Sequence, residues 1–165
     1  RGVGRRRGHV GSVGRIGPTG LMPERFDMQR PTGKKEWLEF DYSGNQVISN
    51  NGKRSIELPL ITGAQDPLSA IYQLAMAAQE DSEGTLVAAG TKRIKGYPYR
   101  AHGRESIRTA LGNIHAIMVT RSGESGSGDM KLWLSPQHHY LPVRVSYVDE
   151  GGTEWVLEAI SVKQE

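Results

Sequence analysis

The sequence predicts an α+β fold, in which a curved antiparallel β-sheet, a half-barrel meander, is wrapped around one main α-helix. Three observations support this class. Only residues 63–79 carry apolar residues at helical spacing. Elsewhere, apolar and polar residues alternate over short segments, which is typical of strands with one buried face. The 21 Gly and 8 Pro indicate many short elements joined by turns.

The predicted helix has a well-marked start. The Asp66 carboxylate can accept hydrogen bonds from the free N–H groups of the first turn. Pro67 suits the first helical position, because the N–H group that it lacks would have no helical partner there. The apolar residues that follow share one face, so we expect this face to lie on the sheet. They are Leu68, Ile71, Tyr72, Ala75 and Ala78.

The chain begins with a basic segment. Residues 1–13 are predicted to form a disordered Arg/Gly-rich leader, because few large apolar side chains offset the entropy cost of ordering this backbone. One interpretation is an arm that contacts RNA or phosphate; the one we adopt is the remnant of a leader. The absence of an initiator Met predicts that a preceding segment has been removed. Residues 14–165 are predicted to form a single β-rich domain.

The segment before the helix is predicted to form a meander. Residues 14–31 contain closely spaced Pro and Gly, which indicates an extended or turning path. Strands are then predicted at residues 37–42, 46–49 and 55–60, where apolar and polar residues alternate. Asn51-Gly52 suits a hairpin turn, because both residue types tolerate positive φ.

More strands are predicted after the helix, and the last two form the clearest hairpin. Leu141, Val143, Val145 and Tyr147 are expected to share one face. After a turn at residues 149–152, the alternation continues with Trp155, Leu157 and Ala159. The predicted segments are 85–91, 93–100, 105–111, 114–121, 131–134, 141–148 and 154–162.

These segments add up to an antiparallel meander of roughly eight to ten strands, interrupted once by the helix. One helix covers only part of a sheet this large, so we expect the sheet to curve around it. Gly90, Gly96 and Gly103 can permit that bending. The concave side is then expected to be apolar and partly open, which suits an apolar ligand.

Composition excludes several kinds of protein. The chain has no Cys, which excludes disulfides and thiolate sites, and no apolar run reaches the length of about 18 residues that a membrane helix needs. Residues 1–35 hold nine Lys or Arg against two acidic residues, whereas residues 36–165 hold twelve against sixteen. The basic character therefore belongs to the leader, and no specific nucleic-acid partner is predicted for the body.

No catalytic residue, metal site or cofactor is predicted, so we expect the protein not to be an enzyme. His138 and His139, with His102 and His115 elsewhere, could supply imidazoles to a metal, but neighbouring residues on a turn usually point apart. Ser125 and Ser127 lie in a Gly-rich loop that cannot hold a nucleophile in place. Carboxylate pairs in turns, such as Asp149 with Glu150, are expected to face water.

A ligand on the concave side would contact the helix face and large side chains on the strands. Arg144 points away from Val143 and Val145, and it is either an exposed charge or a partner for a phosphate or carboxylate at a cavity rim. The aromatic residues either pack in the core or line an open cavity. The predicted ligand-binding residues are Leu68, Ile71, Tyr72, Ala75, Tyr97, Trp133, Arg144 and Trp155.

Three short motifs carry a family resemblance. They are residues 20–26 (GLMPERF), residues 63–69 (GAQDPLS) and Trp133-Leu134-Ser135-Pro136 followed by Leu141-Pro142-Val143-Arg144-Val145. From about residue 14 onward the chain resembles the exported bacterial domain-of-unknown-function family numbered 3108, as an N-terminally shortened member. The resemblance implies a periplasmic protein. The shape it implies is similar to that of periplasmic lipoprotein-carrier proteins of the LolA/LolB kind, in which a curved sheet holds an acyl chain.

The leading functional hypothesis is a non-enzymatic periplasmic protein of the cell envelope, which holds a lipid, an acyl chain or an apolar peptide in its concave sheet. The second hypothesis is a structural or assembly partner with a filled core, whose edge strands recruit another envelope protein. The third is a metal-dependent hydrolase that uses His138 and His139. None of these requires a membrane-spanning segment.

Overall fold

The computed structural model describes residues 7–124, 126–149 and 151–163. Over these residues the chain forms eleven strands, one α-helix and one short 3-10 helix. It divides into two compact units, Arg1–Ala70 with Val87–Gly96, and Ile71–Leu86 with Tyr97–Glu165. In the described part of the chain, no helix is both long and apolar enough to cross a membrane.

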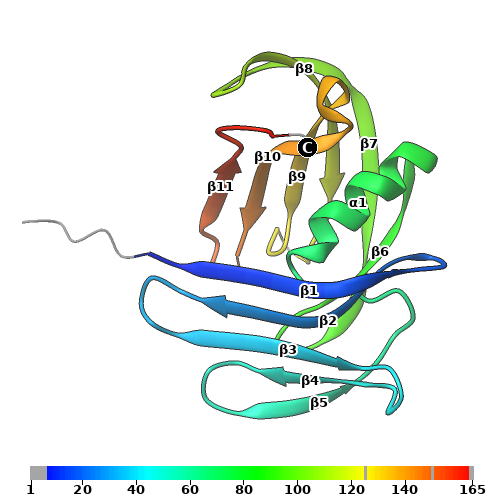
Figure 1. Cartoon of the computed structure of the whole chain (residues 1–165), viewed down its shortest axis with the longest axis vertical. Helices are drawn as coiled ribbons and strands as arrows, with labels where there is room; N and C mark the ends of the chain where they lie inside the picture. Colours follow the sequence, from blue (N-terminus) through cyan, green and yellow to red (C-terminus); the bar gives the residue numbers. More distant parts are fainter. Residues whose placement is uncertain (1–6, 125, 150, 164–165) are drawn as a thin grey trace, which may run out of the picture. The chain divides into compact units, whose positions relative to one another are not determined.

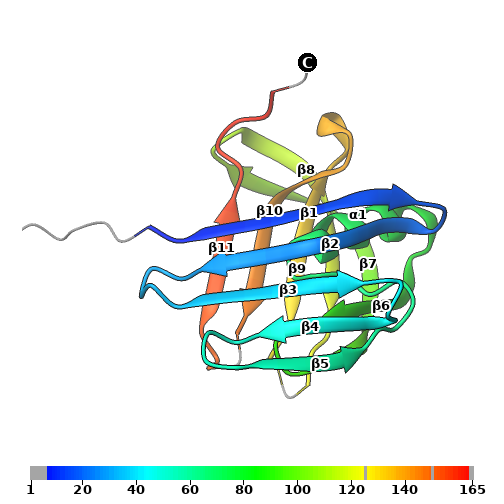
Figure 2. The same cartoon turned by 60° about the horizontal axis from the view of Figure 1, so that its bottom comes forward.

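The first unit contains a five-stranded antiparallel meander, shown face-on in Figure 2. Each strand pairs with the next one along the chain, because short turns connect them. The last three strands match the three predicted before the helix. The strands are β1 (His9–Gly17), β2 (Gly20–Gln29), β3 (Lys35–Asp41), β4 (Gln46–Asn50) and β5 (Ser55–Pro59).

The core of this unit follows from the alternation along its strands. Phe26, Leu38 and Val47 are fully buried and belong to one apolar cluster. Glu36 continues the buried side of β3, and Arg30 and Lys34 donate to its carboxylate at 3.2 and 2.7 Å. The buried charge is therefore paired within the β2–β3 hairpin.

The second unit contains most of a six-stranded antiparallel sheet, in the order β11-β10-β9-β8-β7-β6 (Figure 1). β6 and β7 also contribute residues to the first unit. The short 3-10 helix η1 (Pro136–His138) connects β9 to β10. The strands are β6 (Glu83–Ala89), β7 (Ile94–Thr109), β8 (Gly112–Arg121), β9 (Met130–Ser135), β10 (Leu141–Val148) and β11 (Glu154–Glu158).

The helix α1 (Ser69–Glu80) begins after the predicted cap. Asp66 Oδ1 accepts hydrogen bonds from the N–H groups of Leu68 and Ser69, each at 2.8 Å, which confirms its capping role. Asp66 is fully buried, and Ser12 of β1 donates to its Oδ2 at 2.6 Å. The helix begins at Ser69 rather than at Pro67, because the residues between them form a turn.

The predicted α+β class is confirmed: antiparallel sheets dominate, one α-helix is present in the described residues, and the two sheets are not closed. Two details differ from the expected single meander. The strands are divided between two sheets. Residues 93–100 and 105–111, predicted as separate strands, belong to the single strand β7, which bends at a β-bulge between Ala101 and Arg104, where Gly103 lies.

The boundary predicted for the disordered leader also differs from the structure. β1 begins at His9 and pairs with β2 along its whole length, so residues 9–13 belong to the sheet. Backbone pairing orders this segment although its own side chains are mostly small or exposed. Residues 1–6 lie outside the described residues. We predicted that residues 14–165 form one domain. The chain divides into two compact units, and the single domain stays a prediction.

Candidate ligand-binding site

One face of the six-stranded sheet carries an apolar strip that we call the Trp155 face. Directly opposed residues on antiparallel strands share a face, so the register across β8, β9, β10 and β11 defines this strip. It consists of two neighbouring rows, Val119, Leu132, Val145 and Leu157 in one, and Arg121, Met130, Tyr147 and Trp155 in the other.

Exposure rises along the Trp155 face toward the edge of the sheet. Leu132 is fully buried and Val145 is buried, whereas Leu157 on the edge strand β11 is 59% exposed. Trp155 is 47% exposed, and its indole Nε1–H donates to Asp149 Oδ2 at 2.9 Å, which fixes the ring. The apolar row thus continues from the core to the exposed side chain of Leu157 without a polar residue between them. Exposed apolar patches of this kind are candidate ligand-binding surfaces.

Arg121 lies at the inner end of this face, and it is buried, with 6% of its surface exposed. Its guanidinium carbon lies 4.6 Å from the centre of the Tyr97 ring, and Nη2 donates to Gly128 O at 2.8 Å. Nε finds no hydrogen-bond partner among the described residues. Burial lowers the pKa of Arg121, although an arginine stays protonated at neutral pH. A buried cation with an unused donor is therefore part of this face.

The opposite face of the same sheet, which we call the Trp133 face, is covered by another part of the unit. Here the end of the β7–β8 hairpin folds over toward β10 and β11 (Figure 1). Ile107 and Leu111 of the hairpin pack against the buried residues beneath it. The Trp133 face consists of Ile114, Ala116, Trp133, Val143, Arg144 and Glu158.

Arg144 holds the hairpin on this face. Its guanidinium carbon lies 5.7 Å from the Trp133 ring centre, and it donates to Glu158 Oε2 at 2.9 Å and to Arg108 O at 2.6 Å. The other oxygen of Glu158 accepts from the Ala110 N–H at 2.9 Å. This N–H and the Arg144 side chain lower the pKa of Glu158. The partners that a ligand would have supplied to Arg144 come from the protein itself.

The predicted ligand-binding residues fall into separate groups. Leu68 packs against the core of the five-stranded unit. On the helix, Ile71 and Ala75 are buried and Tyr72 is 46% exposed. The structure brings Tyr97 and Trp155 to the Trp155 face, and Trp133 and Arg144 to the Trp133 face. Their role in ligand binding stays a prediction.

Three of the four histidines considered as metal ligands share a hydrogen bond with a nearby hydroxyl group. The pairs are His102 with Thr120 at 2.8 Å, His115 with Ser106 at 3.2 Å, and His138 with Ser135 at 2.7 Å. Among the described residues, no group of three or more His, Asp or Glu is placed to hold a metal ion. Ser125 and Glu150 lie outside the described residues.

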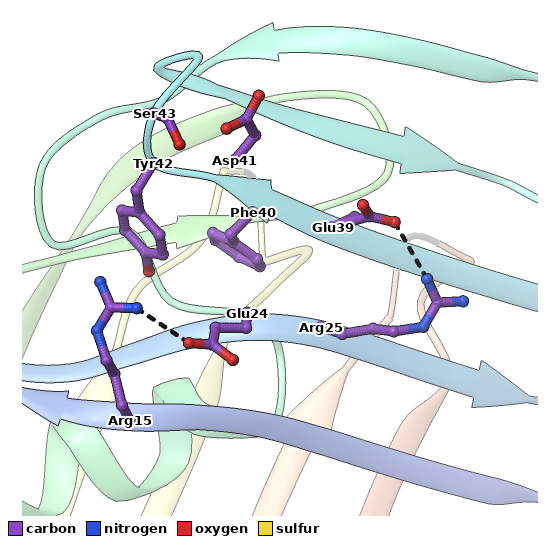
Figure 3. Close-up of a pocket in the computed structure, with 8 residues that line it drawn as sticks. All are labelled: Arg15, Glu24, Arg25, Glu39, Phe40, Asp41, Tyr42 and Ser43. Carbon is purple, nitrogen blue, oxygen red and sulfur yellow. Dashed lines mark hydrogen bonds and ion pairs between the residues drawn. The ribbon is translucent and has the colours of Figure 1, made fainter.

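The five-stranded unit has a pocket of about 590 Å³ that the sequence did not predict (Figure 3). The pocket lies where β2 and β3 move apart. The last pair of opposed residues at this end of the two strands is Arg25 with Glu39. The Tyr42 hydroxyl donates to Pro23 O at 2.8 Å across this gap. Burial is the main cause that raises the pKa of Tyr42, so the hydroxyl keeps its proton at neutral pH.

A β-bulge shapes this pocket. The register between β1 and β2 shifts at Val13 and Gly14, so Glu24 is an extra residue in β2. A Cβ on Gly14 would lie 2.3 Å from Met22 O, so only glycine fits there. Two exposed ion pairs, Arg15 with Glu24 at 3.0 Å and Arg25 with Glu39 at 3.3 Å, lie along the rim (Figure 3). The rim is too polar to suit an acyl chain.

Sequence reasoning missed Arg121 as a candidate residue. Its signal was present, because Arg121 lies two positions after Val119 in the predicted strand 114–121 and so shares its face. The burial and the unused donor could not be read from the sequence, because they depend on Tyr97 and on the chain around Gly128.

Fold and site together define the class: an α+β protein of open antiparallel sheets, one of which carries an apolar strip that is exposed at its edge strand. Residues 3–158 match the model of the family described as protein of unknown function (DUF3108), and the chain belongs to this family. The predicted family is thereby confirmed. No curated protein and no solved structure matches the chain. The N-terminal shortening and the likeness to lipoprotein carriers stay predictions.

Proposed function

We propose that the protein is a non-enzymatic binding protein of the bacterial cell envelope, located in the periplasm, which holds an acyl chain on its Trp155 face. The family gives no function, so the proposal rests on the surface itself. Its single carrying observation is the row Leu132, Val145 and Leu157, which is buried at one end and 59% exposed at the other.

An acyl chain suits this row better than a polar ligand. Covering apolar surface contributes about 25 cal/mol per Å² and needs no matching of polar groups. Leu157 offers aliphatic contact, and Trp155 adds a large ring whose only polar atom already donates to Asp149. The exposed end of the row lies on the edge strand β11, so a flexible chain can reach Leu157 and Trp155 from solvent.

The test is uptake of a neutral acyl probe, the methyl ester of a dansyl-labelled undecanoic acid, measured by fluorescence titration. We expect wild-type protein to bind it, and Leu157→Glu to weaken binding about tenfold or more because a charge replaces the apolar contact. The matched control is Val156→Glu. Val156 lies next along β11, is 58% exposed and points to the opposite face, so this variant should bind normally.

Two outcomes would contradict the proposal. One is failure of the wild-type protein to take up the probe at micromolar protein concentration. The other is equal weakening by Leu157→Glu and Val156→Glu, which would show that the two faces do not differ. Circular dichroism of both variants establishes that each substitution leaves the fold intact.

A second candidate function is recruitment of another envelope protein by an edge strand. The observation that favours it is β1, which is an edge strand of the five-stranded sheet and exposes three large apolar residues. Val10 is 45% exposed, Val13 67% and Ile16 84%. Edge strands of this kind can add a strand from a partner. Co-purification of a defined envelope protein, lost in Val13→Lys, would support it; unchanged recovery with that variant would exclude β1.

A further inference from the structure

We propose that the edge strand β11 pairs with β11 of a second copy of this chain and so forms a two-fold symmetric dimer. The inference goes beyond the proposed function and does not depend on it. It starts from the outer edge of the six-stranded sheet. There β11 pairs with β10 on one side, and among the described residues no strand pairs with its other side (Figure 1).

The backbone of β11 has groups that point toward this free side. The Ala159 N–H donates to Val143 O of β10 at 2.9 Å. Along an antiparallel strand, consecutive residues direct their N–H and C=O groups to alternate sides. Every second residue before Ala159 therefore bonds to β10. The residues between them direct their backbone groups away from β10, and they are Glu154, Val156 and Glu158.

The edge also lacks most of the features that prevent strand addition. Natural edge strands are protected by Lys, Pro, a β-bulge or a covering segment. Residues 154–158 contain no Lys or Pro, and they pair with β10 without a register shift. The two charges of the strand lie at its ends. Between them Trp155, Val156 and Leu157 are 47%, 58% and 59% exposed, so apolar side chains flank the free backbone groups on both faces.

The sequence of β11 specifies a second copy, because its pattern of Glu, apolar, Val, apolar, Glu is the same in both directions. In an antiparallel pair centred on Val156, the Val156 side chains of the two copies oppose each other, and Trp155 opposes Leu157 of the second copy. A shift by two residues would place Val156 opposite a Glu, and a shift by one would misalign the backbone groups. The two-fold axis uses this one edge in both copies, so the assembly closes as a dimer.

One repulsive contact and the small size of the interface limit the affinity. In this register Glu154 opposes Glu158 of the second copy, and Arg144, which donates to Glu158 at 2.9 Å, offsets part of the repulsion. The paired edge is about 17 Å long and buries less than the roughly 1,200 Å² of a stable interface. We therefore expect a dissociation constant of about 50–500 µM. The acyl titration at micromolar concentration then measures the monomer.

The test is sedimentation equilibrium of the full chain between about 10 µM and about 1 mM, combined with hydrogen exchange over the same range. We expect monomer at the low end and dimer at the high end. Exchange of the Val156 N–H should slow as the protein concentration rises, because this group gains a partner in the dimer. The Leu157 N–H already bonds to β10 and should change little.

Three variants separate edge pairing from other kinds of association. Val156→Pro removes the outward N–H and leaves the bonds to β10, so it should weaken the dimer about tenfold or more. Its matched control, Val156→Thr, keeps the N–H and the branched side chain and should dimerise like the wild type. Glu154→Gln removes the repulsion but keeps an oxygen for the Ser146 hydroxyl, and it should tighten the dimer several-fold.

Two outcomes would overturn the inference. One is a wild-type chain that stays monomeric at about 1 mM. The other is a dimer that Val156→Pro leaves intact, since the interface would then lie elsewhere. If Val156→Pro fails to fold, the concentration dependence of Val156 N–H exchange in the wild-type protein decides the matter. Failure of the acyl probe to bind would overturn the proposed function alone.

Discussion

The two faces of the six-stranded sheet use their arginines in opposite ways. On the Trp133 face, Arg144 is half-buried, and its donors go to Glu158 and to Arg108 O. On the Trp155 face, Arg121 is buried more deeply and keeps Nε without a partner among the described residues. Arg144 thus bonds to two other parts of the unit, whereas Arg121 keeps one N–H donor without a partner among the described residues.

The apolar side chains of the two faces also differ in how far they are exposed to solvent. Ile114, Ala116 and Val143 of the Trp133 face are fully buried under the β7–β8 hairpin. The Trp155 face ends instead in the exposed side chains of Trp155 and Leu157. We call the Trp133 face closed because the hairpin covers its buried cluster, although Val156 on β11 stays exposed on that side. We call the Trp155 face open because it ends in two large exposed apolar side chains, to which the proposed ligand can add contacts.

Core truncation on the closed face should have the largest effect. Ile114→Ala removes a fully buried side chain, and we expect it to lower the free energy of unfolding by about 2–5 kcal/mol. Leu157→Ala on the open face should cost less than about 1 kcal/mol, because its side chain already meets water. Urea denaturation of both variants measures the contrast. Equal losses would mean that the two faces are equally closed.

Releasing the hairpin should have an intermediate effect. Arg144→Ala removes the bonds to Glu158 and to Arg108 O, whose exposed oxygens can turn to water instead, so we expect a smaller loss of unfolding free energy than in Ile114→Ala. Hydrogen exchange should accelerate over residues 105–112 far more than over β9. If exchange rises evenly across the sheet, Arg144 does not act through the hairpin.

Removing the other arginine should cost little. In Arg121→Met the buried charge and its unused donor disappear while most of the side-chain volume remains, and the lost bond to Gly128 O offsets this gain, so we expect the free energy of unfolding to change by less than about 1 kcal/mol. Thermal denaturation without ligand provides the measurement. A loss as large as that of Arg144→Ala would make Arg121 a structural residue and remove the contrast between the faces.

Acidification should loosen the closed face by a small amount. The pKa of Glu158 is lowered in the folded state, so its contribution is present above the unfolded-state value of 4.5 and is lost as the pH falls through the folded-state pKa. The Ala110 N–H signal should therefore shift with a midpoint below pH 4.5. Glu158→Gln should remove this titration, and a midpoint at or above 4.5 in the wild-type protein would contradict the assignment.

Local patterns predicted much of the fold. The turns and alternation at residues 37–60 gave β3 to β5 nearly residue by residue, and Asp66 is the helix cap that its position implied. The β1–β2 hairpin was missed, because Gly and Pro between residues 11 and 23 hide the alternation while the backbone still pairs. Strand pattern alone did not indicate where one sheet ends and another begins.

The candidate site was only partly predictable. Alternation placed Val145 and Tyr147 on one face of their strand and predicted alternation at Trp155 and Leu157 on the next; the register brings the two pairs to one face. It also placed Val143 there, which is wrong, because a register shift between Pro142 and Arg144 moves Val143 into the cluster under the hairpin. Bulges and long-range contacts decide which face such a residue lies on, and the spacing of apolar residues in the sequence does not reveal them.

The most direct test of the account is methyl NMR spectroscopy with a nitroxide-labelled stearic acid methyl ester. If an acyl chain lies on the Trp155 face, the spin label should broaden the methyl signals of Leu157 much more strongly than those of Val143 and Ile114. Broadening of Val143 and Ile114 to the same extent, or of no methyl signal at all, would contradict the claim that the open face is the binding face.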